Sequence, residues 1–96
     1  TGVSGKAALK VGRKLIEVSH KHQVLCITHH AQIASLANAH FHISKSVEND
    51  RTTTQVNKLS DREREIEIAR LLSGDTSEST IKLAREMLQN GAGLRG

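Results

Sequence analysis

Residues 24–30 read Val-Leu-Cys-Ile-Thr-His-His, and this stretch decides the fold class that the sequence predicts. Its four apolar residues follow one another without the alternation of a half-exposed strand. A short unbroken apolar run of this kind is typical of a strand that is buried on both faces of a sheet. The run therefore predicts an α/β fold in which residues 24–27 form an interior strand and Cys26 is a small core residue.

The residues before this strand predict one amphipathic helix. Its apolar side chains are Ala8, Val11, Leu15 and Val18. They recur three to four residues apart, which puts them on one helix face and carries the helix to about His20. Residues 1–5 form a small-residue loop ahead of it, in which Ser4 can cap the first turn. Because no earlier strand is present to pair with residues 24–27, we expect the chain to be the C-terminal part of a larger α/β domain.

The residues after the strand predict a short helix over residues 31–38, followed by a hairpin. From residue 41 onward apolar and polar side chains alternate, as in a strand with one apolar face. Turn-forming residues occupy positions 47–51, and β-branched residues continue to residue 56. Two strands that flank a polar turn indicate an antiparallel β-hairpin.

Two closing helices are predicted from their end signals. Ser60 and Glu63 have the spacing of a capping box, and Gly74 is expected to end the helix that they begin. The apolar side chains expected to face inward from this helix are Ile66, Ala69 and Leu72. The last helix is expected to begin at Asp75 or Thr76 and to end at Gly91.

The composition limits the classes of function. The chain has 96 residues, a formal net charge of +4, a single aromatic side chain, Phe41, and a single cysteine. One cysteine excludes an intrachain disulfide, and no apolar run approaches the ~18 residues of a membrane span. The near absence of aromatic residues disfavours a stand-alone binder of single-stranded nucleic acid, which stacks bases on aromatic rings. These features favour one small cytoplasmic domain, or a piece of one, with no membrane partner.

Four basic residues gather in the first predicted helix, namely Lys6, Lys10, Arg13 and Lys14. The three lysines repeat every four residues, so they line one helix face. Such a stripe can contact the phosphates of a nucleic acid, and it is also the ordinary pattern of a solvated helix face. The sequence leaves both interpretations open.

The histidines divide into one candidate for ligand binding and several surface residues. His29 follows the predicted strand at its carboxyl end, where ligands bind in open α/β sheets. A neutral imidazole there can hydrogen-bond a phosphate oxygen or a water molecule, or it can simply be a solvated loop residue. His40 and His42 share one face of a strand, but no cysteine pair or carboxylate spacing completes a zinc site around them, and no metal ligand is predicted.

Four stretches together resemble a known family. They are TGVSGKAALKVGRKL at residues 1–15, HQVLCITHHAQIASLANAHFHISK at 22–45, REIEIARLLSG at 64–74 and TIKLAREML at 80–88. In this order they resemble the C-terminal end of the bacterial DNA repair family RecN, whose members are relatives of the SMC proteins with an ABC-type ATPase head. The resemblance implies the C-terminal part of a P-loop NTPase head over residues 1–90, with a flexible tail at 91–96.

The resemblance also implies roles for single residues. The stretch TGVSG matches the family's D-loop, so Ser4 and Gly5 would contact nucleotide across a dimer of two ATPase heads. His29 matches the switch histidine, which contacts the γ-phosphate and helps to hold the attacking water. The family commonly has Leu-Pro after this histidine, whereas this chain has His30-Ala31.

The resemblance implies ATP and Mg²⁺ as ligands of the full-length protein, because the phosphate-binding and metal-binding motifs of the family would precede residue 1. The chain alone is therefore expected to be inactive as an ATPase. In the full-length protein the implied partners are DNA and a second head in a homodimer, with a cytoplasmic, nucleoid-associated location. Two alternatives remain: a small basic nucleic-acid-binding domain, and the corresponding segment of another ABC-type ATPase.

Overall fold

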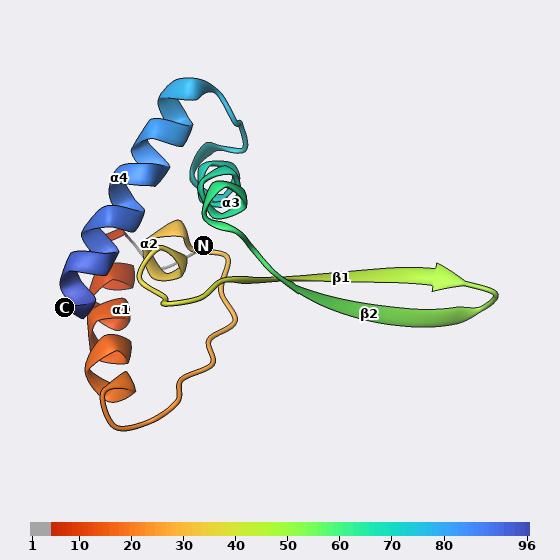
Figure 1. Ribbon diagram of the computed structural model, residues 1–96, viewed down its shortest axis with the longest axis horizontal. Helices are drawn as coiled ribbons and strands as arrows, with labels where there is room; N and C mark the ends of the chain where they lie inside the picture. The colour runs from red at the N-terminus through yellow and green to blue at the C-terminus, as the bar shows by residue number, and fades with distance from the viewer. Residues whose placement is uncertain (1–4) are drawn as a thin grey trace.

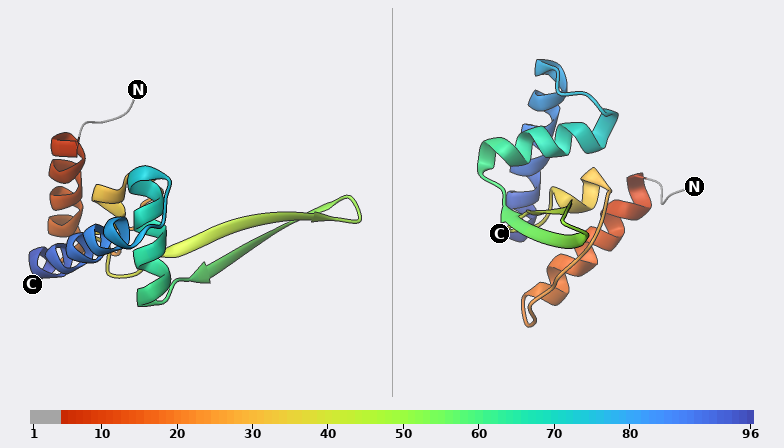
Figure 2. Two further views of the ribbon diagram at one scale, coloured as in Figure 1. Left: turned by 90° about the horizontal axis from the view of Figure 1, so that it is seen from above. Right: turned by 90° about the vertical axis from the view of Figure 1, so that its right-hand side faces the viewer.

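The computed structural model describes residues 5–96, and in these residues helices and a two-stranded sheet occupy opposite ends of the molecule (Figure 1). The elements in chain order are α1 (Gly5–Ser19), α2 (Ala31–Ala34), β1 (Phe41–Glu48), β2 (Arg51–Lys58), α3 (Asp61–Ser73) and α4 (Glu78–Arg95). The helices cluster together, whereas β1 and β2 project away from them as a long hairpin, which gives the molecule extents of 45 × 36 × 30 Å (Figure 2).

The core lies where α2, α3 and α4 meet. Its buried residues are Ala31, Ala34, Ile68, Ala69, Ile81 and Ala84, and the side chains of Leu71, Leu72, Met87 and Leu88 pack around them. Alanine makes up most of this core, so the helix backbones approach one another closely. Among the residues that the structure describes, Ile68 is the largest side chain that is fully buried.

The predicted hairpin is confirmed, with its turn inside the predicted segment. Asn49 and Asp50 have φ values of 50° and 61°, the left-handed pair that a two-residue type I′ turn requires. The turn sets the register, in which Glu48 faces Arg51 and Phe41 faces Lys58. Nearly every hairpin side chain is exposed, so the strands are held by their mutual backbone pairing rather than by the helical core.

The end signals of α3 are also confirmed. The Ser60 hydroxyl accepts from the Glu63 amide at 3.2 Å, and the Glu63 carboxylate accepts from the Ser60 amide at 2.8 Å. Gly74 ends the helix with a φ of 76°, a conformation that glycine adopts without steric cost. The expected inward face was partly wrong, because Ile66 is 38% exposed whereas Ile68 and Ala69 are fully buried.

The start of α4 lies slightly beyond the predicted position. Its N-cap is Ser77, whose hydroxyl accepts from the Thr80 amide, rather than Asp75 or Thr76. Asp75 supports this cap, because its carboxylate accepts from the Ser77 amide at 3.0 Å and from the Ser77 hydroxyl at 2.9 Å. These hydrogen bonds, with smaller contributions from Thr80 and Ser73, lower the pKa of Asp75 to about 2.

We expect the Asp75→Asn variant to lose stability at neutral pH but not in strong acid. The pKa of Asp75 is about 2 in the folded state, against a usual value of 3.8, so its contribution is present above pH 3.8 and is lost as the pH falls toward 2. Melting temperatures of the two proteins should therefore converge between these pH values. Gln89→Ala, which changes an exposed side chain of α4 without removing an ionisable group, should melt in parallel with the parent protein at every pH. A constant gap between Asp75→Asn and the parent down to pH 2 would contradict this assignment.

The predicted interior strand at residues 24–27 was wrong for this chain. The segment is extended but carries no strand pairing, and the sheet of the described residues contains β1 and β2 alone. Leu25 and Ile27 are 88% and 95% exposed, and Cys26 is exposed rather than buried. A strand is buried within a sheet only when neighbouring strands pair with it, and the described residues place no strand beside this segment.

Two helix ends differ from the predictions because of contacts that are distant in sequence. α2 ends at Ala34 instead of continuing to residue 38, since the carbonyl oxygens of residues 34, 36 and 37 accept hydrogen bonds from arginines of α3 and α4. α4 does not end at Gly91 but continues to Arg95, so it includes most of the residues expected to form a tail. Gly91 is buried against the backbone of Ser35 and Leu36.

Candidate functional site

His29 lies at the end of the extended segment, immediately before α2. Its side chain is exposed and stacks on the ring of His30, with ring centroids 4.5 Å apart and an interplanar angle of 29°. The backbone next to it is held by hydrogen bonds at both the amide and the carbonyl of His30. The His30 amide donates to the Thr28 hydroxyl at 3.0 Å, and the His30 carbonyl accepts from the amides of Ile33 and Ala34. The structure thus presents the His29 imidazole to solvent from a well-anchored backbone.

The first turn of α2 lies beside the start of α1. A Cβ atom built on Gly5 would lie 3.7 Å from Nε2 of Gln32, three residues beyond His29. Gly5 is the last residue of the predicted D-loop, and the structure therefore brings the end of that loop next to the histidine-bearing segment. The other predicted D-loop residues, Ser4 among them, lie outside the described residues.

The basic stripe of α1 is confirmed as an exposed surface. Lys6, Lys10, Arg13 and Lys14 are all exposed. Lys14 also contacts Glu17 at 3.5 Å, but both side chains are about 70% exposed, so this pair leaves the positive face largely intact. Binding of nucleic acid to this face stays a prediction.

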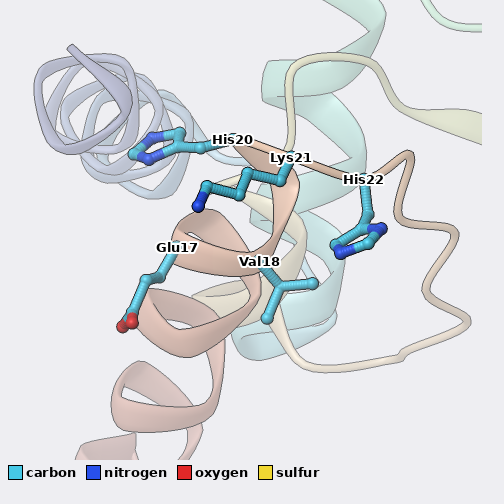
Figure 3. A pocket seen from close by; sticks show the side chains of 5 residues that line it. All are labelled: Glu17, Val18, His20, Lys21 and His22. Carbon is cyan, nitrogen blue, oxygen red and sulfur yellow. The ribbon is translucent and has the colours of Figure 1, made fainter.

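A shallow pocket at the C-terminal end of α1 gathers titratable side chains without forming a metal site. It is lined by Glu17, Val18, His20, Lys21 and His22 (Figure 3). Their polar groups point in different directions from the helix end and the loop after it. Across the described residues, no group of three or more His, Cys, Asp or Glu side chains is arranged to hold a metal ion.

His40 lies in a partly buried environment near charged side chains. It is partly buried just before β1, and burial, aided by the positive charge of Arg64, lowers its pKa. Its partner in the sequence pattern, His42, lies in the hairpin and is exposed. The two histidines therefore differ in their surroundings.

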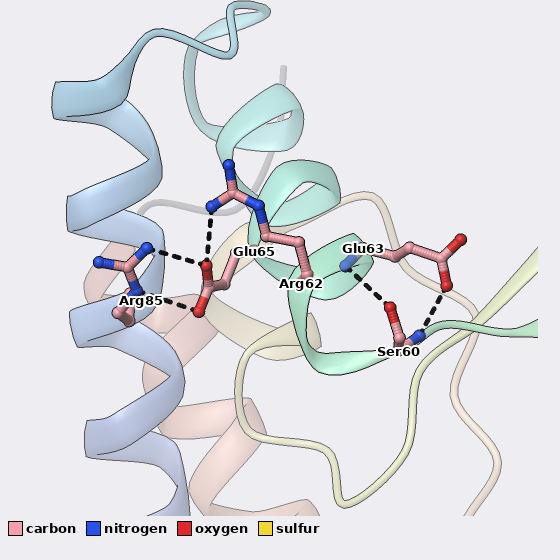
Figure 4. A network of polar contacts seen from close by, with 5 residues as sticks. All are labelled: Ser60, Arg62, Glu63, Glu65 and Arg85. Atoms are coloured by element: carbon pink, nitrogen blue, oxygen red, sulfur yellow. Dashed lines mark hydrogen bonds and ion pairs between the residues drawn. The ribbon is translucent and has the colours of Figure 1, made fainter.

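A polar network ties α3 to α4 (Figure 4). The Glu65 carboxylate accepts from Nε and Nη2 of Arg85, both at 3.1 Å, and from Arg62 at 3.3 Å. These guanidinium groups hold the pKa of Glu65 below its usual value. Since the network engages Arg85 with a carboxylate, it fixes the two helices against each other rather than offering a free cation to a ligand.

Sequence comparison finds relatives that are described as DNA repair protein RecN. The chain is 46% identical over 87 residues to the DNA repair protein RecN of Deinococcus radiodurans, which covers 91% of the chain. It is 42% identical over 90 residues to RecN of Bacillus subtilis, covering 93% of the chain. The chain belongs to the RecN family. No family model matches it.

The match covers nearly all of this RecN chain but only a small part of its relatives. The chain spans 15% of the length of the Deinococcus protein and 16% of the Bacillus protein. The family resemblance inferred from the four sequence stretches is thus confirmed. Family membership assigns no role to a single residue, so the switch role of His29 and the D-loop role of Gly5 stay predictions. None of the described helices of this RecN chain is long and apolar enough to cross a membrane.

Proposed function

We propose that this chain is the part of a RecN-type DNA repair ATPase that contributes a D-loop and a switch histidine to ATP hydrolysis, within a head of the P-loop NTPase fold. The observation that carries the proposal is the placement of Gly5 beside Gln32, which joins the end of the D-loop to the segment that presents His29. In this proposal Gly5 and His29 belong to two functional segments 24 residues apart in sequence, and the nearness of Gly5 to Gln32 supports their acting at one site.

His29 suits this role through its exposure and its fixed backbone. An imidazole nitrogen that carries a proton can donate to an oxygen of the γ-phosphate, and the unprotonated nitrogen can accept from the attacking water. The hydrogen bonds of the His30 backbone with Thr28 and with the first turn of α2 hold the backbone that carries His29 in a defined place before nucleotide arrives. Pre-positioning of this kind lowers the barrier because little reorganisation is needed during the reaction.

ATP and Mg²⁺ are ligands of the complete protein in this proposal. Mg²⁺ would neutralise charge on the β- and γ-phosphates, but the described residues of this chain do not form a metal site. The contribution of the chain is limited to contacts with the γ-phosphate, with the attacking water and with nucleotide held by a second head.

The exposure of residues 24–27 favours a larger sheet in the complete protein, of which this segment would be one strand. Leu25 and Ile27 place nearly their whole side chains in solvent, which is costly for a segment with unpaired backbone groups. We propose that the rest of the ATPase head supplies strands that pair with this segment. His29 would then stand at the carboxyl end of an interior strand, where α/β sheets bind their ligands.

DNA and a second head are the partners of the proposed protein, in recombination and repair of double-strand breaks in the cytoplasm at the nucleoid. The four exposed basic residues of α1 support a contact with DNA phosphates. The same surface supports a second candidate function, a basic nucleic-acid-binding unit. Substituting glutamine at Lys6, Lys10 and Lys14 should then weaken DNA binding while ATP turnover without DNA is retained.

The proposal is tested by comparing ATP hydrolysis of the 96-residue chain with that of a complete protein that contains it. We expect turnover in the complete protein and only background in the chain, because residues 5–96 offer no cradle for the phosphates. The measurement is phosphate release by both purified proteins under identical conditions. Turnover by the isolated chain, or a complete protein that binds DNA but never hydrolyses ATP, would contradict the proposal.

A further inference from the structure

Two arginines from different helices hold the same short turn of backbone. Arg64 of α3 donates from Nη2 to the carbonyl oxygens of Ala34 and Ala37, at 3.0 and 2.7 Å. Arg95, the last residue of α4, donates from Nη1 to the carbonyl oxygens of Leu36 and Ala37, at 2.8 and 3.1 Å. The Ala37 carbonyl therefore accepts from both guanidinium groups, and the chain that leaves α2 is fixed from two directions.

Two glycines bring further helices against the same turn. A Cβ atom at Gly91 of α4 would overlap the carbonyl oxygen of Ser35, and a Cβ atom at Gly12 of α1 would overlap Cδ1 of Leu36. Ser35 and Leu36 are correspondingly buried. The turn at residues 34–37 is thus in close contact with α1, α3 and α4. Because the contact is close-packed, the turn cannot shift without displacing its neighbours.

The arginine contacts carry an energetic cost that apolar packing would avoid. Arg64 is only 8% exposed, and its Nε atom is buried without a hydrogen-bond partner. Burial, and next the nearby charge of Arg95, lowers the pKa of Arg64. Buried charges are weak contributors to stability but define geometry well, because each donor has few acceptable positions.

The held turn is connected to His29 by a short and continuous path. α2 contains only Ala31–Ala34, and its first hydrogen bonds run from the amides of Ile33 and Ala34 to the carbonyl of His30. A shift of Ala34 would therefore act on the His30 carbonyl, which lies one peptide beyond the peptide that joins His29 to His30. We propose that Arg64, Arg95 and Gly91 form a clamp on residues 34–37 that positions His29 for ATP hydrolysis. This α2 clamp rests on the proposed function of His29 as the switch histidine.

The clamp is tested in the complete protein through Arg95, which is only partly buried and is not one of the residues of the hydrophobic core. We expect Arg95→Gln to lower kcat for ATP hydrolysis about tenfold with KM changed less than about twofold, because a small displacement of a catalytic group affects turnover more than binding. Arg95→Lys, which keeps the charge and can reach one carbonyl, should restore part of kcat. Lys82→Gln, which removes one positive charge from an exposed position of the same helix, is the matched control and should keep the parent kcat. Equal kcat values for Arg95→Gln and the parent would overturn the clamp.

A second pair of variants tests the same contact without changing charge. Gly91→Ala adds one carbon atom against the Ser35 carbonyl and should lower kcat as Arg95→Gln does. Gly93→Ala adds the same atom two residues later, where nothing lies within 4 Å, and should leave kcat unchanged. Equal kcat values for both alanine variants would count against the clamp.

A double variant separates this inference from the proposed function. If Arg95 acts through His29, Arg95→Gln should cause no further loss of kcat in a protein that already carries His29→Ala. A full additional tenfold loss in that background would overturn the clamp while leaving the switch role of His29 intact. If His29→Ala alone leaves kcat unchanged, the proposed function of His29 fails, and the clamp fails with it.

Discussion

Replacement of His29 by alanine in the complete protein is expected to lower kcat for ATP hydrolysis by about 10²–10³-fold, which is the usual effect of removing one pre-positioned donor to transition-state charge. ATP binding should weaken far less, because most of the binding contacts to the phosphates belong to other parts of an ATPase head. Steady-state turnover and a nucleotide titration of the same preparations measure the two quantities.

His30→Ala is the matched control for this prediction. The structural contacts of His30 come from its backbone amide and carbonyl, which alanine retains, whereas its ring only stacks on His29. We therefore expect a much smaller loss of kcat from His30→Ala. Equal losses from the two variants would show that the switch role belongs to neither residue alone, and a larger loss from His30→Ala would move the role to His30.

The parts of the fold that the sequence predicted correctly are those fixed by local interactions. The capping box at Ser60 and Glu63, the left-handed stop at Gly74 and the turn at Asn49 and Asp50 each involve residues that are close in sequence. Their side chains and φ values satisfy the backbone groups of the same turn, so the pattern in the sequence contains the whole interaction.

The parts that were wrong depend on contacts from far along the chain. The end of α2 is determined by Arg64 and Arg95, which follow it by about 30 and 60 residues. Nothing in the charged stretch at residues 61–65 distinguishes buried Arg64 from exposed Arg62. The error at residues 24–27 has a different origin. Their apolar pattern is typical of a strand inside a sheet, but the described residues provide no strand to pair with them.

The candidate site was predicted in part. His29 was singled out by its position after an apolar run and by the family resemblance, and the structure adds that its ring is exposed and its backbone anchored. The proximity of Gly5 to Gln32 had no signal in the sequence, since it arises from the packing of α1 against α2. The clamp residues were missed for the same reason. Gly91 could have been recognised if α4 had been predicted to continue past it. A glycine within a helix often marks a place where another backbone approaches closely.

The stability of the helical cluster is expected to depend on Ile68 more than on any other side chain of α3. Its side chain is fully buried at the junction of α2, α3 and α4, and most of the other buried residues of this core are alanines. Small neighbours have few atoms with which to fill a cavity, so Ile68→Ala should lower the free energy of unfolding by about 2–4 kcal/mol. Ile66→Ala removes the same atoms from a side chain that is 38% exposed and should cost no more than about 1 kcal/mol. Chemical unfolding of both variants, followed by helical circular dichroism, measures the difference, and equal losses would mean that the apolar face of α3 is the one centred on Ile66.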